Sequence, residues 1–122
     1  MASFKLPKST EEEKSGRRKA IRDSTLHAAQ VPFETAQEAS RLLNKLPLLA
    51  TKGNANAVSD VGVAGLLASA AAKGAIFNVE INLDSLPEEC GQEMRDALPV
   101  MKEQIKTDSR AVMDEVRRRI DS

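Results

Sequence analysis

Hydrophobic side chains recur along most of the chain at steps of three and four residues, the spacing that places them on one face of an α-helix. One such stripe lies between Phe33 and Leu46, and another lies between Val100 and Ile120. Strand-like alternation is confined to residues 78–83, and we expect helix there too, because no second strand is available to pair with it. The pattern predicts an all-α fold.

Capping residues and prolines divide the first half of this pattern. Thr10 followed by Glu13 has the form of a capping box and predicts the start of the first helix. We expect Pro32 to end or kink that helix, because proline disfavours helical backbone at the residue before it. A second break or bend is expected within Lys45–Pro47, and Gly53 predicts a helix end.

The last helix is expected to start near Ser85 or Pro87, since proline fits a first turn, and to bend near Pro99. Together these segments predict an up-and-down bundle of about four long helices. A chain of 122 residues is enough for one domain but not for two. We therefore expect residues 1–122 to form a single helical domain.

The segment of residues 54–83 holds few charges and many Ala, Gly, Ser and Val residues. A helix without a polar face is expected to be buried on all sides. Its small residues, among them Gly62 and Gly65, would allow another helix to approach closely. We do not expect a membrane span, because the most apolar window is interrupted by Lys73 and dominated by small residues.

Composition then excludes several classes of function. The chain has 18 Lys+Arg against 18 Asp+Glu, and its aromatic residues are 3 Phe. It therefore lacks both a strong positive field and a stacking surface for nucleic acid. Cys90 has no disulfide partner, which favours a cytoplasmic setting, and together with the single His27 it cannot build a zinc site. We expect no metal, nucleic-acid or membrane partner.

A cluster of polar residues opens the apolar segment between Gly53 and Asp60. Asn54 or Asn56 is well suited to cap the helix, and capping explains part of the cluster. Asp60 lies four residues after Asn56 and hence on the same helix face. A buried carboxylate must be hydrogen-bonded or change its pKa, so Asp60 is also a candidate group for proton transfer.

Asn78 and Asn82 also share one helix face, on an otherwise apolar stretch. Two interpretations stay open for them. The two amides can tie helices together, or they can bind the amide and carbonyl groups of a heterocycle.

Four sequence blocks then follow one another at a characteristic separation: MASFKLPKSTEEEK at residues 1–14, VPFETA at 31–36, GNANAVSDVGVA at 53–64 and NVEINL at 78–83. In order and spacing they resemble the formiminotetrahydrofolate cyclodeaminase / methenyltetrahydrofolate cyclohydrolase family. The resemblance implies an all-α fold that dimerises through its helices. It also implies a reduced folate, a tetrahydrofolate derivative, as substrate, with either ring closure and loss of ammonia or hydrolysis of the methenyl bridge.

The resemblance also implies roles for residues at matching motif positions. Asp60 would transfer protons or stabilise the amidinium-like cation. The amides would suit the pterin ring, and a lysine would suit the glutamate tail. The implied substrate-binding residues are Asn56, Ser59, Asn78, Asn82, Lys5 and Lys8.

One family feature is missing from this sequence. Family members are longer and begin with helices that carry a Pro-Gly-Gly-Gly-Ser segment, so the chain resembles the C-terminal part of the domain. We expect the apolar faces left open by the missing helices to drive homo-oligomerisation, or a companion chain to supply the missing half. The alternative is a non-catalytic helical interaction module that keeps the family's core.

Overall fold

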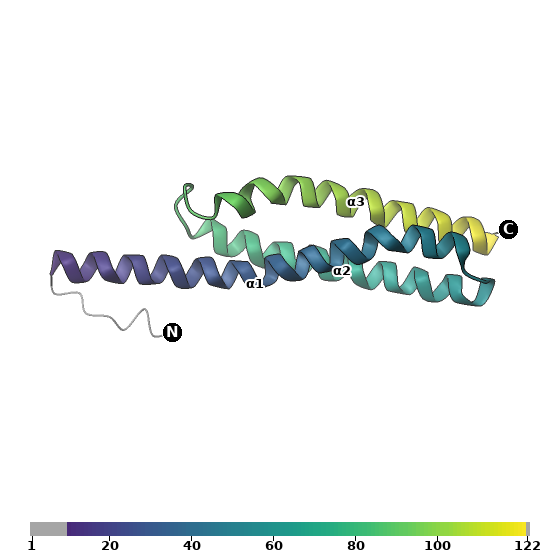
Figure 1. The fold of residues 1–122 in the computed structure, drawn as a ribbon, viewed down its shortest axis with the longest axis horizontal. Coiled ribbons are helices and arrows are strands. Elements are labelled where there is room, and N and C mark those ends of the chain that lie inside the picture. Colours follow the sequence, from purple (N-terminus) through teal and green to yellow (C-terminus); the bar gives the residue numbers. More distant parts are fainter. Residues whose placement is uncertain (1–9, 122) are drawn as a thin grey trace.

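The computed structural model describes residues 10–121. Within this range the chain forms three α-helices joined by short turns: α1 (Glu11–Lys52), α2 (Ala55–Asp84) and α3 (Gln92–Asp121). The chain runs up α1, down α2 and up α3, and each helix packs against the other two (Figure 1). The predicted all-α, up-and-down fold is confirmed, with three helices over the described residues in place of four.

The prolines do not divide the helices as predicted. Pro32 and Pro47 both lie inside α1, which continues over 42 residues, and Pro99 lies inside α3. An internal proline removes one backbone hydrogen bond. In α1 that loss is offset by packing, because Phe33 and Leu46, the immediate neighbours of the two prolines, are buried in the core.

The predicted start of α1 and the predicted boundary between α1 and α2 are confirmed. The Thr10 hydroxyl oxygen accepts a hydrogen bond from the Glu13 backbone N–H at 3.0 Å, which caps α1. Gly53 ends α1, and the side-chain oxygen of Asn54 accepts a bond from the Ala57 N–H at 2.9 Å to cap α2. These ends were predictable because each cap involves residues only three or four apart.

Helix α3 begins later than predicted, at Gln92 and not at Ser85 or Pro87. The intervening residues form turns that end at Gly91, whose φ of 70° lies in the left-handed region. Arg95 holds this turn by donating hydrogen bonds to four backbone carbonyls, those of Leu83, Leu86, Pro87 and Cys90. Arg119 does the same for the turn between α1 and α2, bonding the carbonyls of Ala50, Thr51 and Gly53.

The small residues of α2 bring it close to α3, as the sequence predicted. A Cβ atom added to Gly65 would lie 2.9 Å from Val112 Cγ1, and one added to Gly62 would lie 3.1 Å from Val116 Cγ1. Ser109 also donates a hydrogen bond to Ser69 across this contact, at 3.0 Å. The rest of the core is apolar, mostly aliphatic with Phe33 and Met94, and comes from all three helices.

Helix α2 is not buried on all sides, and that prediction was wrong. Its inner side packs on α1 and α3, but its outer side leaves large apolar residues open, including Leu67 (67% exposed), Phe77 (64%) and Ile81 (69%). The charge-poor composition of α2 therefore belongs to two different faces. The inner face packs against α1 and α3, and the outer face is covered by no other helix of the described chain. By length and composition the stretch Asn56–Asp84 also meets the criterion for a membrane span, contrary to our expectation, as core helices can.

Candidate functional site

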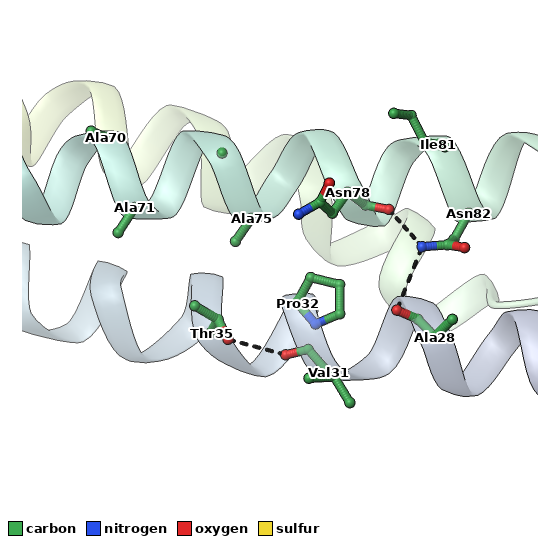
Figure 2. Close-up of a pocket in the computed structure, with 11 residues that line it drawn as sticks. Ala28, Val31, Pro32, Thr35, Ala70, Ala71, Ala75, Asn78, Ile81 and Asn82 are labelled. Carbon is green, nitrogen blue, oxygen red and sulfur yellow. Dashed lines mark hydrogen bonds between the residues drawn. The ribbon is translucent and has the colours of Figure 1, made fainter.

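An open groove of about 580 Å³ runs between α1 and α2. Its α1 wall is formed around Pro32 and Thr35, and its α2 wall carries Asn78 and Asn82, two of the predicted substrate-binding residues (Figure 2). The floor between them is made of small side chains. The groove therefore combines an apolar surface with two amides, the composition usual for sites that bind flat organic ligands.

Asn82 links the two walls of this groove. Pro32 has no N–H, so the carbonyl of Ala28, four residues earlier, loses its normal helical partner. The Asn82 side-chain nitrogen donates a long hydrogen bond of 3.5 Å to that carbonyl and a second one of 2.9 Å to the Asn78 carbonyl (Figure 2). Of the two interpretations of these amides, helix tying therefore describes the contacts of Asn82.

Asn78 presents a different arrangement. It is exposed, and its side-chain amide lies between the two helices, above Pro32 (Figure 2). Thr35 lies one turn further along α1, and its hydroxyl donates to the Val31 carbonyl at 3.2 Å. Asn78 is thus the polar side chain best placed to contact a ligand in the groove.

The other predicted cluster lies at the opposite end of α2. Asn56, Ser59 and Asp60 are all exposed there, and the Ser59 hydroxyl donates to the Asn56 carbonyl at 3.2 Å. The expectation that Asp60 is a buried carboxylate was wrong for the single chain, because it lies on the uncovered outer face of α2. Its proposed role in proton transfer stays a prediction.

One chain does not bring the two clusters together. Asp60 and Asn78 lie 18 residues apart on the same continuous helix, which corresponds to about 27 Å at the helical rise. A pterin ring held beside Asn78 would therefore not reach Asp60 of the same chain.

The buried carboxylate of the described chain is Asp108, on α3, with 7% of its surface exposed. Its Oδ2 accepts hydrogen bonds from the Gln104 side chain at 2.9 Å and from the Asn44 side chain on α1 at 3.3 Å. The sequence analysis did not single it out. The Asn44 bond joins α1 to α3, whereas the Gln104 bond lies within α3, and neither residue lines the groove between α1 and α2.

The remaining candidates do not form a second site. His27 is exposed, and Cys90 is half-buried against the core. No group of three metal-ligating residues occurs within residues 10–121. Lys5 and Lys8, predicted to bind the glutamate tail, lie outside the described residues.

One clear electrostatic effect is found near the end of α3. Glu115 accepts a hydrogen bond from Arg118, and this bond lowers the pKa of Glu115 against a smaller opposing effect of desolvation. The same bond raises the pKa of Arg118. Both groups stay in their ordinary charged forms near neutral pH, so this pair is not a candidate for proton transfer.

Comparison with known proteins supplies the family. The sequence profile described as formiminotransferase-cyclodeaminase matches residues 1–99, which include the groove and both polar clusters. The chain belongs to this family. The resemblance inferred from the four sequence blocks is therefore confirmed.

Two relatives indicate the range of activities within the family. The methenyltetrahydrofolate cyclohydrolase of Methylorubrum extorquens is 35% identical over 95 residues, which are 78% of this chain and 46% of that protein. The formimidoyltransferase-cyclodeaminase of Gallus gallus is 39% identical over 89 residues, 73% of this chain and 16% of that protein. The chain thus spans less than half the length of either relative.

The α1 wall of the groove was missed as a functional surface. Its signal was present in the VPFETA block at residues 31–36, but the proline in that block was interpreted only as a helix boundary or kink. The structure instead places Pro32 in mid-helix, where its ring faces the groove (Figure 2).

Proposed function

We propose that this chain acts in folate one-carbon metabolism, on a tetrahydrofolate derivative, as a cyclodeaminase or a methenyltetrahydrofolate cyclohydrolase. The observation that carries this proposal is the family match over residues 1–99. The amide-bearing groove between α1 and α2 supports it, because a pterin ring is flat and has an amide edge.

The two candidate reactions need similar help from the protein. In the cyclodeaminase reaction, folate N10 attacks the formimino carbon on N5, a carbon–nitrogen bond to the formimino nitrogen breaks, and ammonia leaves. In the cyclohydrolase reaction, water adds to the methenyl carbon, one ring carbon–nitrogen bond breaks, and formyltetrahydrofolate and a proton are released. Each reaction needs a group that accepts a proton from the attacking atom.

We assign that proton transfer to Asp60, whose carboxylate would also stabilise the positive charge on the one-carbon unit. Asn78 would bind the pterin edge, and because it lies about 27 Å from Asp60 along α2, the two roles would fall to two different copies of the chain. The other proposed contacts to the substrate are Asn56, Ser59, Asn82, Lys5 and Lys8.

A non-catalytic interaction module is the second candidate. It is favoured by the distance between Asp60 and Asn78 along α2. In this case the chain keeps the packing of the family without its chemistry.

Two ultraviolet assays separate these candidates. The purified chain is mixed with 5,10-methenyltetrahydrofolate, whose absorbance decays on hydrolysis, and separately with 5-formiminotetrahydrofolate, from which that absorbance appears. We expect turnover in one assay, and we expect Asp60→Asn to reduce kcat by about 100-fold or more, the usual contribution of a positioned base. Asp114→Asn, an exposed carboxylate on α3, is the matched control and should retain full turnover.

The outcomes are distinct. Full turnover by Asp60→Asn would remove Asp60 from the mechanism while leaving the enzyme assignment intact. Absence of both turnover and folate binding in the unaltered chain would contradict the enzyme assignment and favour the interaction module.

A further inference from the structure

Arg119, in the last turn of α3, lies at the turn that leads from α1 into the polar cluster of α2 (Figure 1). Its Nη1 donates hydrogen bonds of 2.8 Å to the carbonyls of Ala50 and Thr51, and its Nη2 donates one of 2.6 Å to the carbonyl of Gly53. The last carbonyls of a helix have no partner further along it. One cation therefore satisfies three carbonyls at the negative end of the α1 dipole.

These contacts use the particular shape of an arginine side chain. A guanidinium is planar and carries its donors in a fixed fork, so it can bond several acceptors at once, whereas a lysine ammonium is a compact point charge. Arg119 is partly buried, and hydrogen bonds to a charged donor are stronger than those between neutral groups. The guanidinium thus joins the end of α3 to the boundary between α1 and α2.

The same part of α3 also packs on the first half of α2. A Cβ atom added to Gly62 would lie 3.1 Å from Val116 Cγ1, and Val116 precedes Arg119 by less than one helical turn. The end of α3 therefore supports the beginning of α2 by close packing, and it holds the preceding turn through Arg119.

The polar cluster starts directly after this turn. Asn54 follows Gly53 and caps α2, and Asn56, Ser59 and Asp60 lie in the first two turns of the helix. The last three are exposed. Their placement therefore depends on the backbone at the beginning of α2 more than on packing of their side chains.

We propose that Arg119 is a positioning residue for the reaction assigned to this cluster. By holding the turn between α1 and α2, it fixes the beginning of α2 and hence the carboxylate of Asp60. Arg119 lies outside residues 1–99, the range that the family profile matches. The catalytic consequence rests on the proposed function, whereas the holding of the turn does not.

This role has a distinct kinetic signature. A proton-transferring group that is displaced by about 1 Å can lose about 100-fold in rate. The groove at Asn78, in contrast, lies about 27 Å from Asp60 along α2, so substrate binding there should not depend on the turn. Loss of Arg119 is therefore expected to lower kcat and to leave KM nearly unchanged.

Amide hydrogen exchange followed by NMR tests whether Arg119 holds the turn. The reporters are the amides of Gly53, Ala57 and Val58, which are hydrogen-bonded at this boundary. We expect Arg119→Ala to speed their exchange at least about tenfold, because the turn then opens locally. Amides of residues 75–83, in the other half of α2, should keep their rates.

Two further variants complete this experiment. Arg117→Ala, at an exposed arginine on the same helix, is the matched control and should leave all these rates unchanged. Arg119→Lys keeps the charge without the fork and should show the effect of Arg119→Ala in smaller measure. Equal rates in Arg119→Ala and Arg117→Ala would overturn the proposal. Equal acceleration along the whole of α2 would also overturn it, because that result reports a general loss of stability.

The two ultraviolet assays test the catalytic consequence. We expect Arg119→Ala to lower kcat about 10- to 100-fold and to leave KM within about threefold of its value in the unaltered chain. Arg119→Lys should have an intermediate kcat, and Arg117→Ala should have the full kcat. A raised KM at unchanged kcat would overturn the positioning role.

Failure of this proposal is distinguishable from failure of the proposed function. Without turnover in the unaltered chain, the proposed function is removed, and exchange at the turn still decides whether Arg119 holds the cluster. With turnover in the unaltered chain and an equal kcat in Arg119→Ala, the proposed function stays and the positioning role is removed.

Discussion

Gly16 and Gly91 differ in what an added side chain would meet. Gly16 lies in exposed helix with open space around it, whereas Gly91 has a φ of 70°, and a Cβ there would lie 2.7 Å from Leu83 Cδ2. We expect Gly16→Ala to raise the free energy of unfolding by up to about 1 kcal/mol. We expect Gly91→Ala to lower it by about 1–3 kcal/mol, because both the backbone and the packing must adjust.

Urea unfolding of the two variants beside the unaltered chain provides the measurement, at a protein concentration held constant because association would add to stability. Two effects of the same sign would contradict the left-handed backbone assigned to Gly91.

The two carboxylates Asp60 and Asp108 show what the sequence reveals about single residues. Asp108 lies three residues after Ile105 and four before Val112, so the hydrophobic pattern itself places it on the buried face of α3. Its partner Asn44, 64 positions away, was not predictable, because that contact depends on how α1 and α3 pack. The exposure of Asp60 was not predictable for a similar reason: a charge-poor sequence does not reveal which of its faces a neighbour covers.

At the scale of helices, the sequence predicted where a helix begins or ends more accurately than whether a helix continues through a proline. Thr10, Gly53 and Asn54 act on residues within a single turn. Thr10 and Gly53 were identified correctly, and Asn54 is one of the two candidates, with Asn56, that the sequence offered for the α2 cap. Of the two alternatives for Pro32, a helix end was wrong, because α1 continues through it. Asn82, a distant residue, donates to the carbonyl that the proline leaves without its helical partner.

This compensation predicts a measurable coupling between two helices. We expect Pro32→Ala to raise the free energy of unfolding by about 1–3 kcal/mol, since the new N–H can bond to the Ala28 carbonyl. Asn82→Ala should cost about 1 kcal/mol in the unaltered chain and less in the Pro32→Ala background. A double-mutant cycle measured in urea should therefore give an interaction of about 0.5 kcal/mol or more. Strictly additive effects would show that Asn82 does not serve the Ala28 carbonyl.

At the scale of the whole molecule, the three described helices leave the outer face of α2 uncovered in the single chain, with Leu67, Phe77 and Ile81 exposed. The beginning of α1 is also uncovered, because it extends beyond the turn between α2 and α3 (Figure 1). The sequence predicted open apolar faces in general terms, from the missing part of the family domain. It did not locate them, because location depends on the antiparallel packing of α1, α2 and α3. The same packing separates the two halves of the candidate site.

The beginning of α1 should be the least protected helical segment of the described chain. Before Leu26, which contacts the turn at Gly91, α1 has no buried residue. A helix this short is marginal without packing, and exposed pairs such as Lys19–Asp23 add at most about 0.5 kcal/mol each. We therefore expect amides of residues 15–24 to exchange with deuterated solvent at least about 100-fold faster than those of residues 36–50, because opening the end of α1 requires no core to be broken.

Hydrogen-exchange mass spectrometry of the unaltered chain provides this measurement, and the amides of residues 36–50, which lie on the part of α1 that packs in the core, are its internal control. Equal protection of residues 15–24 and 36–50 would contradict the prediction and would mean that another chain packs on this end of α1, the part that no helix of the described chain covers.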